Sequence, residues 1–584
     1  MVHRTQRRST SPARRDRLKI LHVVVLAFAG IIAVRLFTLQ VLRHGAYAAI
    51  AENQHNLSSK LTPNRGEIRV KDRANPGVLF PLATNIDAPL LVAVPKSIAE
   101  PSDVAQKLAP IVGLPVAELF PKLSKPDDQY EVLKRQLSPT EVSAVEALHI
   151  TGLRFEKERL RYYTEGNLAS HVVGFVGYHE DTRVGLYGVE AAMEKALAGI
   201  KGKLDFGKSA AQEFLPVSGG LLTEAINGSQ VTLTLDHTVQ YQACNKLKTA
   251  VAKHGADGGA LVIMEVQTGR LLAVCGQPDF DPNQYAKTED IAAFNNPVVF
   301  GAYEPGSIFK AITMASGLDL GKVTPQSTYV DTGAEKIGSF TIRNSDGKAN
   351  GTQTMTQVLE KSLNTGAMHV AQLVGQGGFG KYVRNFGFGE KTGVEMSGEV
   401  AGNLASLTKP GDIFLATNSF GQGLTATPIQ LVAAFGAIAN GGKLMQPYVV
   451  DDITYPDGKL EKREPKVVRQ VLRSDTAATL GAMLVNVVEK GHGQRAGVKG
   501  YYVAGKTGTA QMRAATGSGY DANKTIGSFA GFAPVENPKF VMLTRIDVPK
   551  DVQFAESSAA PLFGEVMDFL LKYYDVAPTR NLAG

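Results

Sequence analysis

The chain has 584 residues, of which 44% are hydrophobic and 20% are charged, and two are cysteines. The length exceeds one compact unit, the apolar content excludes wholesale disorder, and the cysteine count excludes a disulfide-rich scaffold and a cysteine-rich zinc domain. Basic residues exceed acidic ones by 62 − 55 = 7, but residues 1–19 alone contribute six of these charges. The rest of the chain is nearly neutral, so we expect it to bind no nucleic acid.

The first predicted element is a membrane anchor. Residues 20–42 are rich in Val, Leu, Ile, Ala and Phe, with an uninterrupted apolar core at 23–34. A helix of this length rises ~34 Å, enough to cross a ~30 Å hydrocarbon layer. We therefore predict a basic cytoplasmic arm at 1–19, a transmembrane helix at 20–42 and an exported body. The alternative is a cleaved signal peptide, but its small-x-small site, Ala46-Tyr47-Ala48, lies far beyond the apolar core and behind Arg35 and Arg43.

The pattern of apolar and polar residues in the exported chain changes near residue 225. Before that point we expect a strand at 90–94 and amphipathic helices at 101–119 and 140–148. After it we expect a C-terminal helix at 561–576 and strands at 231–235, 259–264, 271–275, 501–504, 527–533 and 540–546. Strands at both ends with helices between them predict an α+β domain at 226–579, preceded by a separate domain at 43–225.

The first chemical motif is Ser307-x-x-Lys310. Pro305 and Gly306 interrupt the chain before an apolar helical pattern, so we place Ser307 at or near a helix N-terminus, where free N–H groups favour developing negative charge. Lys310 projects from the same face and can accept the serine proton if burial keeps its amine neutral. Taken alone, this motif is more often a serine cap beside a solvated lysine.

The second motif is Ser362-Leu363-Asn364, which follows a predicted helix that begins at Thr354. Ser362 and Asn364 are two residues apart and can point the same way from a loop. One can relay a proton while the other hydrogen-bonds a substrate amide. Taken alone, the motif is an ordinary loop after a helix.

The third motif is Lys506-Thr507-Gly508-Thr509, after the predicted strand at 501–504. A lysine and two hydroxyls on a strand edge can bind a carboxylate. With Gly500 the stretch also fits the phosphate-loop pattern, but Tyr501, Tyr502 and Val503 are too bulky and β-prone for a phosphate cradle. We therefore reject nucleotide binding.

Other patterns predict no cofactor. The G-x-G-x-x-G at 375–380 follows a helical pattern where a dinucleotide fold needs a strand, so we predict a loop there. The 11 histidines show no metal-ligand spacing, and we expect no metal. Cys244 and Cys275 can form a disulfide outside the cytoplasm, but Cys275 on a strand favours a buried thiol.

In this order, S-x-x-K, S-x-N and K-T-G are the motifs of penicillin-binding proteins and β-lactamases. The sequence further resembles the class B penicillin-binding proteins, which are peptidoglycan D,D-transpeptidases. The stretches that carry this resemblance are Arg65-Gly66-Glu67-Ile68, Arg161-Tyr162-Tyr163, His171-Val172-Val173-Gly174, 185–190, Phe420-Gly421-Gln422-Gly423, Thr427-Pro428-Ile429-Gln430 and 529–534. The 420–423 stretch and the lack of C-terminal extension modules are most similar to the division (septal) branch, with the elongation branch as the alternative. Residues 70–76 depart from the family pattern in a turn of the N-terminal domain.

The resemblance implies a fold and a location. We expect an α+β transpeptidase domain at 226–579, an antiparallel sheet flanked by helices, on an elongated pedestal (dimerisation-like) domain at 43–225. A single-pass anchor would hold the chain in the bacterial cytoplasmic membrane, with the N-terminus inside and the catalytic domain outside. The implied partners are peptidoglycan stem peptides ending in D-Ala-D-Ala, β-lactam antibiotics, a polytopic membrane glycosyltransferase and other division proteins.

The resemblance also implies residue roles. Ser307 is the nucleophile, Lys310 its base, Ser362 the proton relay and Lys506 a source of positive potential. Substrate binding falls to Asn364, Thr507, Gly508 and Thr509, and the backbone N–H groups of Ser307 and Thr509 form an oxyanion hole. The alternatives are a D,D-carboxypeptidase or β-lactamase-like hydrolase with the same residues, or a division scaffold without activity.

Overall fold

The computed structural model describes residues 13–38, 61–180, 182–205, 221–513 and 519–580. The chain divides into two compact units, one of Met1–Pro63 with Ile200–Ile226 and the other of Asn64–Gly199 with Asn227–Gly584.

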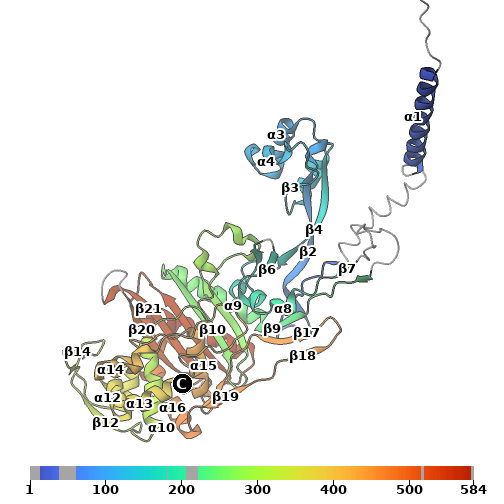
Figure 1. Cartoon of the computed structure of the whole chain (residues 1–584). Helices are drawn as coiled ribbons and strands as arrows, with labels where there is room; N and C mark the ends of the chain where they lie inside the picture. Colours follow the sequence, from blue (N-terminus) through green and yellow to red (C-terminus); the bar gives the residue numbers. More distant parts are fainter. Residues whose placement is uncertain (1–12, 39–60, 181, 206–220, 514–518, 581–584) are drawn as a thin grey trace, which may run out of the picture. The chain divides into compact units, whose positions relative to one another are not determined.

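The smaller unit contains helix α1 (Ala13–Phe37) and a hairpin of β7 (Lys203–Asp205) and β8 (Leu221–Thr223) (Figure 1). Its apolar side chains on α1 are exposed, Leu26 by 70% and Ile31 by 67%. Over the described part of the chain, no helix reaches the combined length and apolar character of a membrane span. The anchor predicted at 20–42 is therefore not confirmed, and the alternative cleavage site at 46–48 lies outside the described residues.

The larger unit has a seven-stranded sheet that joins distant parts of the chain. Its strand order is β18 (Leu460–Lys462), β17 (Val450–Thr454), β9 (Gln230–Asp236), β1 (Ile68–Lys71), β2 (Leu79–Ala93) and β3 (Glu131–Lys134), and β4 (Leu153–Tyr163) also pairs with β2. Only the pairing of β1 with β9 is parallel within this sheet. Strand β9, predicted at 231–235, buries Val231, Leu233 and Leu235. It ties the start of the predicted C-terminal domain to the N-terminal one, and the boundary at 225/226 stays a prediction.

Three helices pack on the far end of β2 and β4, namely α3 (Pro101–Val112), α4 (Val116–Leu123) and α5 (Pro139–Glu146). The single helix predicted at 101–119 is wrong, because Gly113 adopts a left-handed conformation (φ +66°) that ends α3. Short elements follow β4 in the chain: α6 (Ser170–Val173), β5 (Val176–His179), β6 (Thr182–Gly185), α7 (Gly188–Ala192) and α8 (Glu194–Leu197).

A buried carboxylate connects these short elements to β4 and to the segment that precedes β1. Glu190 is fully buried and accepts from Arg65 Nε and from Arg161 Nε, each at 2.6 Å. The Tyr163 hydroxyl donates to the same carboxylate at 3.4 Å, and burial together with the Glu190 charge raises the pKa of Tyr163. Three of the stretches that carry the family resemblance therefore meet at one side chain.

The second sheet has five antiparallel strands in the order β11 (Leu271–Gln277), β10 (Gly258–Glu265), β22 (Phe540–Asp547), β21 (Tyr520–Ala533) and β20 (Ala504–Arg513). The β10–β11 hairpin and the strands predicted at 527–533 and 540–546 are confirmed. The strand predicted at 501–504 is wrong, because β20 only begins at Ala504. Tyr501 is instead buried beside the C-terminus, and its hydroxyl donates to Val576 O at 2.6 Å.

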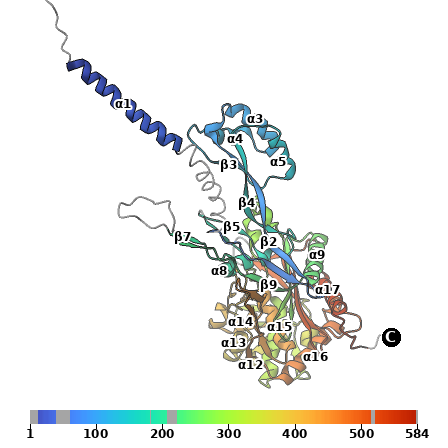
Figure 2. The ribbon, with the colours of Figure 1, turned by 90° about the vertical axis from the view of Figure 1, so that its right-hand side faces the viewer.

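Helices cover both faces of this sheet. One face packs against α9 (His237–Lys253) and α17 (Ala559–Tyr573), which lie on the same side in Figure 2. The opposite face packs against α15 (Pro428–Ala439), whose side chains are buried along nearly the whole helix. Alternating residues of β10 divide between the two cores, since Leu261 and Ile263 belong to one and Val262 to the other. The α+β class and the helix predicted at 561–576 are confirmed.

Cys244 and Cys275 form a disulfide between α9 and β11. The sequence favoured a buried thiol at Cys275, and that prediction is wrong. Packing of α9 on the sheet brings the two Cα atoms to 5.2 Å, a separation that a disulfide spans.

A helical lobe adjoins the edge strand β20. It contains α10 (Lys310–Asp319), α11 (Met355–Glu360), α12 (Asn364–Val374), α13 (Gln376–Asn385), α14 (Asp412–Ser419) and α16 (Ser474–Lys490). The loop predicted at 375–380 is wrong, because residues after Gly375 form α13 and bury Phe379, Tyr382 and Val383. Two small hairpin-like pairs, β12 (Thr328–Asp331) with β15 (Gly351–Thr354) and β13 (Ala334–Ile337) with β14 (Phe340–Arg343), join α10 to α11.

Candidate active site

Ser307 lies in a tight helical turn next to the edge of the five-stranded sheet. The turn η5 (Gly306–Phe309) leads directly into α10, so Ser307 stands at the start of a helical segment. Gly306 has φ +55°, a conformation that glycine adopts without strain, and its N–H donates to Gly421 O at 3.2 Å. A Cβ at Gly421 would lie 2.3 Å from Gly306 O. The 420–423 stretch therefore supports the turn through backbone contact that only glycine allows.

The Ser307 side chain is half-buried, and its hydroxyl forms no hydrogen bond with any other residue that the structure describes. The hydrogen bond to Lys310 that the base role requires is thus not formed in this conformation. Catalytic hydrogen bonds often tighten only when substrate is bound, so this geometry leaves the role open.

The amine of Lys310 is directed at Ser362. Lys310 is 1% exposed, and its Nζ donates to the Ser362 carbonyl oxygen at 2.5 Å and lies 3.3 Å from Ser362 Oγ. Ser362 occupies the bend between α11 and α12 with φ +54°, which is uncommon for a residue with a side chain. This bend presents both oxygens of Ser362 to one amine.

Lys506 approaches Ser362 from the other side. It projects from the edge strand β20, is fully buried, and its Nζ donates to Ser362 Oγ at 2.9 Å and to Thr507 O at 3.1 Å. One hydroxyl therefore lies between two lysine amines, from residues 52 and 144 positions away in the chain.

Burial controls the charge of both amines. It lowers the pKa of Lys506 to about 7. It also lowers the pKa of Lys310 well below the ordinary value, and the positive charge of Lys506 adds to that shift. Both shifts favour the uncharged amine over the ammonium, and an uncharged Lys310 amine can accept a proton.

Strand β20 runs very close to the turn that carries Ser307. A Cβ at Gly508 would lie 2.7 Å from Pro305 O and 2.9 Å from Ile308 Cγ1, so only glycine fits there. Thr507 is buried, and the Thr509 hydroxyl accepts from Ala555 N at 3.1 Å, which leaves its own proton for a ligand.

Asn364 is half-buried at the first turn of α12, and its Nδ2 donates to Arg343 O at 2.8 Å. Its Oδ1 makes no hydrogen bond with the described residues and can accept from an amide N–H. Two nearby residues, Asp331 and Asn344, were missed by the sequence analysis. They lie in a segment without any recognisable motif, and only their contacts with α12 indicate a function.

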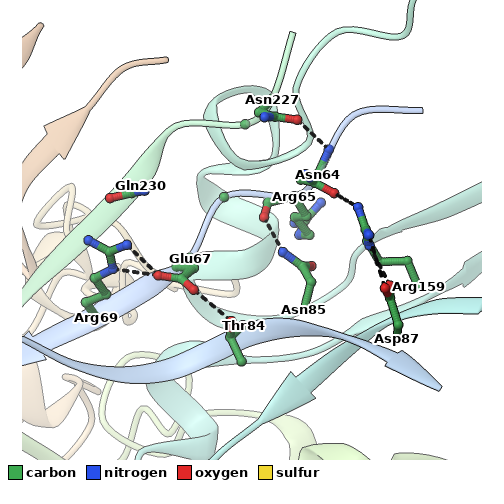
Figure 3. Close-up of a pocket in the computed structure, with 12 residues that line it drawn as sticks. Asn64, Arg65, Glu67, Arg69, Thr84, Asn85, Asp87, Arg159, Asn227 and Gln230 are labelled. Carbon is green, nitrogen blue, oxygen red and sulfur yellow. Dashed lines mark hydrogen bonds and ion pairs between the residues drawn. The ribbon is translucent and has the colours of Figure 1, made fainter. Parts of the chain in front are cut away.

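One cavity lies away from Ser307. A polar hollow of about 420 Å³ lies between β1, β2 and β4, where Arg65, Glu67, Asp87 and Arg159 line it (Figure 3). Its charges are paired within the chain, Arg159 with Asp87 at 2.9 Å and Arg65 with Glu190 and Glu194. The described residues include no cluster of three or more His, Cys, Asp or Glu that could hold a metal ion.

Comparison with known proteins identifies the family. Residues 259–568 match the penicillin-binding protein transpeptidase domain, and residues 60–233 match the penicillin-binding protein dimerisation domain. The stage V sporulation protein D of Bacillus subtilis is 33% identical over 98% of this chain and 88% of its own length. The chain belongs to the class B penicillin-binding proteins.

Further relatives agree with this assignment. The peptidoglycan D,D-transpeptidase FtsI of Escherichia coli is 27% identical over 86% of this chain and 84% of its own length. The crystal structure of penicillin-binding protein 3 from Mycobacterium tuberculosis, complexed with ampicillin, matches with a TM-score of 0.68 and 27% identity, over 90% of this chain and 98% of that one. The resemblance inferred from the motifs is thus confirmed.

Proposed function

We propose that this penicillin-binding protein is a serine D,D-transpeptidase that cross-links peptidoglycan stem peptides through an acyl-enzyme on Ser307. The observation that supports it most is the shared contact of Lys310 and Lys506 with Ser362 Oγ, close to the turn that carries Ser307. The relatives named D,D-transpeptidases support the same reaction.

In the first step, Ser307 Oγ attacks the carbonyl carbon of the penultimate D-Ala. A Ser307–acyl bond forms and the bond to the terminal D-Ala nitrogen breaks. Neutral Lys310 accepts the serine proton, and Ser362 relays a proton to the departing amine. Acid–base assistance of this kind contributes ~10²–10⁴ in rate. In the second step, the amine of another stem peptide attacks the acyl carbonyl carbon, the Ser307–acyl bond breaks, and the proton that the amine loses passes to Ser307 Oγ.

The remaining residues hold the donor peptide. Asn364 Oδ1 accepts from a peptide N–H, and the hydroxyls of Thr507 and Thr509 bind the terminal carboxylate beside the positive charge of Lys506. Backbone N–H groups of Ser307 and Thr509 stabilise the oxyanion, where losing one donor costs roughly 3–4 kcal/mol. Because Gly508 has no side chain, β20 lies close to the turn that carries Ser307, which brings the Thr509 N–H near the Ser307 N–H.

A β-lactam presents a strained amide in place of D-Ala-D-Ala and should acylate Ser307. The decisive test labels wild type, Ser307→Ala and the control Ser143→Ala with a fluorescent penicillin. Ser143 is exposed on α5, in the helical cluster at the end of β2 and β4. We expect label on wild type and on the control only. Equal labelling of Ser307→Ala would refute the assignment of Ser307 as the nucleophile.

A second assay separates transfer from hydrolysis. A pentapeptide donor is supplied together with an amine acceptor, and the products are resolved by mass spectrometry. A cross-linked product supports the transpeptidase, whereas free acid alone would identify a D,D-carboxypeptidase or β-lactamase-like hydrolase.

We also propose that the chain works in septal synthesis from the cytoplasmic membrane, with α1 as its anchor. The exposed apolar side chains of α1 support an anchor, and the resemblance of the 420–423 stretch to the division branch supports a septal enzyme. Depletion of the protein should then give filamentous cells, whereas swollen round cells would favour a role in elongation.

We further propose that α1, with Arg35, pairs with a polytopic glycosyltransferase. Replacing residues 20–42 by an unrelated span should abolish co-purification, and retained co-purification would refute the pairing.

A further inference from the structure

Helix α12, which begins at Asn364, receives its N-terminal cap from another part of the chain. Leu363 occupies the cap position and has no side-chain acceptor. Asn344, which follows β14, replaces it: Asn344 Oδ1 accepts from Asn364 N at 2.9 Å and from Thr365 N at 3.3 Å. Asn344 is 4% exposed, so no solvent competes for these bonds.

Asp331 determines which way the Asn344 amide points. Asn344 Nδ2 donates to both carboxylate oxygens of Asp331, at 2.9 and 3.0 Å. An ionised carboxylate only accepts hydrogen bonds, so the nitrogen of the amide must face Asp331 and its oxygen must face α12. The Thr365 hydroxyl also donates to Asp331, at 2.8 Å, which ties α12 to the same carboxylate.

The surroundings of Asp331 keep it ionised. Burial alone would raise its pKa, but hydrogen bonds from Asn350, Thr365, Gly333 and Asn344 outweigh burial and hold the pKa below its ordinary value. The Asn350 N–H and Nδ2 donate at 3.0 and 2.8 Å, and the Gly333 N–H donates at 3.0 Å.

We propose that Asp331, acting through Asn344, is a positioning residue for the Ser362-Leu363-Asn364 motif. It fixes the start of α12, and thereby the bend that presents Ser362 to the two lysines and Asn364 to the substrate. A carboxylate from β12 thus sets the geometry of a motif 31 residues later in the chain, without touching substrate. The inference rests on the proposed function of that motif.

The test measures acylation by fluorescent penicillin in the full-length chain and separates the noncovalent dissociation constant from the acylation rate constant. Asp331→Asn lets the amide of Asn344 turn, and we expect the acylation rate constant to fall roughly ten- to a hundredfold, as misplacement of catalytic groups does. Asp346→Asn is the control, because Asp346 is exposed in the same segment and should leave the rate unchanged.

The exchanged pair Asp331→Asn with Asn344→Asp gives the sharpest result. An aspartate at 344 still accepts from the N-terminus of α12, and an asparagine at 331 can donate to it. We expect this double variant to recover most of the rate that each single variant loses. If the acylation rate constant of the double variant falls by as much as the two single variants combined, the proposal is overturned. Damage to folding alone would give that result, because the exchange does not repair it.

The test also covers two failures, a variant that does not fold and a wild type that does not acylate. If Asp331→Asn does not fold, Asn344→Ala serves, because it removes the cap and leaves the other donors to Asp331 in place; a wild-type acylation rate in that variant would overturn the proposal. If wild type itself fails to acylate, the proposed function fails instead, so the two failures are distinguishable.

Discussion

Replacing Lys506 by methionine should stabilise the fold and abolish acylation. Lys506 is fully buried with a pKa of about 7, against 10.5 for a lysine in water. This difference of about 3.5 pKa units, at about 1.36 kcal/mol each, corresponds to roughly 5 kcal/mol for burying the ammonium. Methionine avoids that cost but loses two hydrogen bonds worth about 1 kcal/mol each. We therefore expect a gain of about 3 kcal/mol at neutral pH, at the expense of the positive charge in the site.

The pH dependence provides an independent check. The folded pKa lies below the unfolded one, so between pH 7 and 10.5 the unfolded chain binds the extra proton and wild-type stability rises with pH. Below pH 7 both states are protonated and this contribution is flat. Thermal unfolding of the full chain in detergent, at several pH values, should show a higher melting temperature and a shallower slope for Lys506→Met. The control is Lys572→Met, whose side chain is 71% exposed. A melting temperature below that of wild type at pH 7 would refute the reasoning.

Three other perturbations test the structure. Gly508→Ala places a Cβ 2.7 Å from Pro305 O and should slow penicillin acylation at least tenfold; a wild-type rate would contradict the close approach of β20. Removing the disulfide with Cys244→Ser and Cys275→Ser, which opens a 31-residue loop, should lower stability by about 3–4 kcal/mol in denaturant titrations, and insensitivity of wild type to reductant would argue against the bond. Glu190→Ala leaves Arg161 buried without its carboxylate and leaves Arg65 with Glu194 alone, so it should lower the free energy of unfolding by about 3–5 kcal/mol; an unchanged unfolding midpoint would contradict this expectation.

The sequence identified the chemistry because the three motifs depend on local residue types. Ser307 and Lys310 share one helical turn, and their spacing places both side chains near a helix start, although the spacing alone does not predict a nucleophile. The order of S-x-x-K, S-x-N and K-T-G then indicated which protein family the chain resembles, without any knowledge of its fold. The apolar, β-prone residues of β10 and β22 likewise reflect local propensity, so both strands were predicted within one residue at each end, whereas β21 begins at Tyr520, well before the predicted start at 527.

Local patterns failed where a distant contact outweighed them. Residues 501–503 have β-propensity, yet they have no strand partner and Tyr501 packs beside the C-terminus instead. The glycine-rich 375–380 stretch predicts a loop, but burial of Phe379 and Val383 stabilises a helix there. The disulfide depends on how α9 packs against the sheet, which no spacing of cysteines reveals.

By itself, the sequence determined the family, the α+β class and the residue types available for acyl transfer. Only the tertiary structure decided that two lysine amines meet at the Ser362 hydroxyl and that burial lowers the pKa of Lys506 to about 7. It also decided that Asn344, oriented by Asp331, caps α12. The physical reason is that pKa, burial and hydrogen-bond direction are properties of a surrounding assembled from distant segments, and they do not exist until those segments pack together.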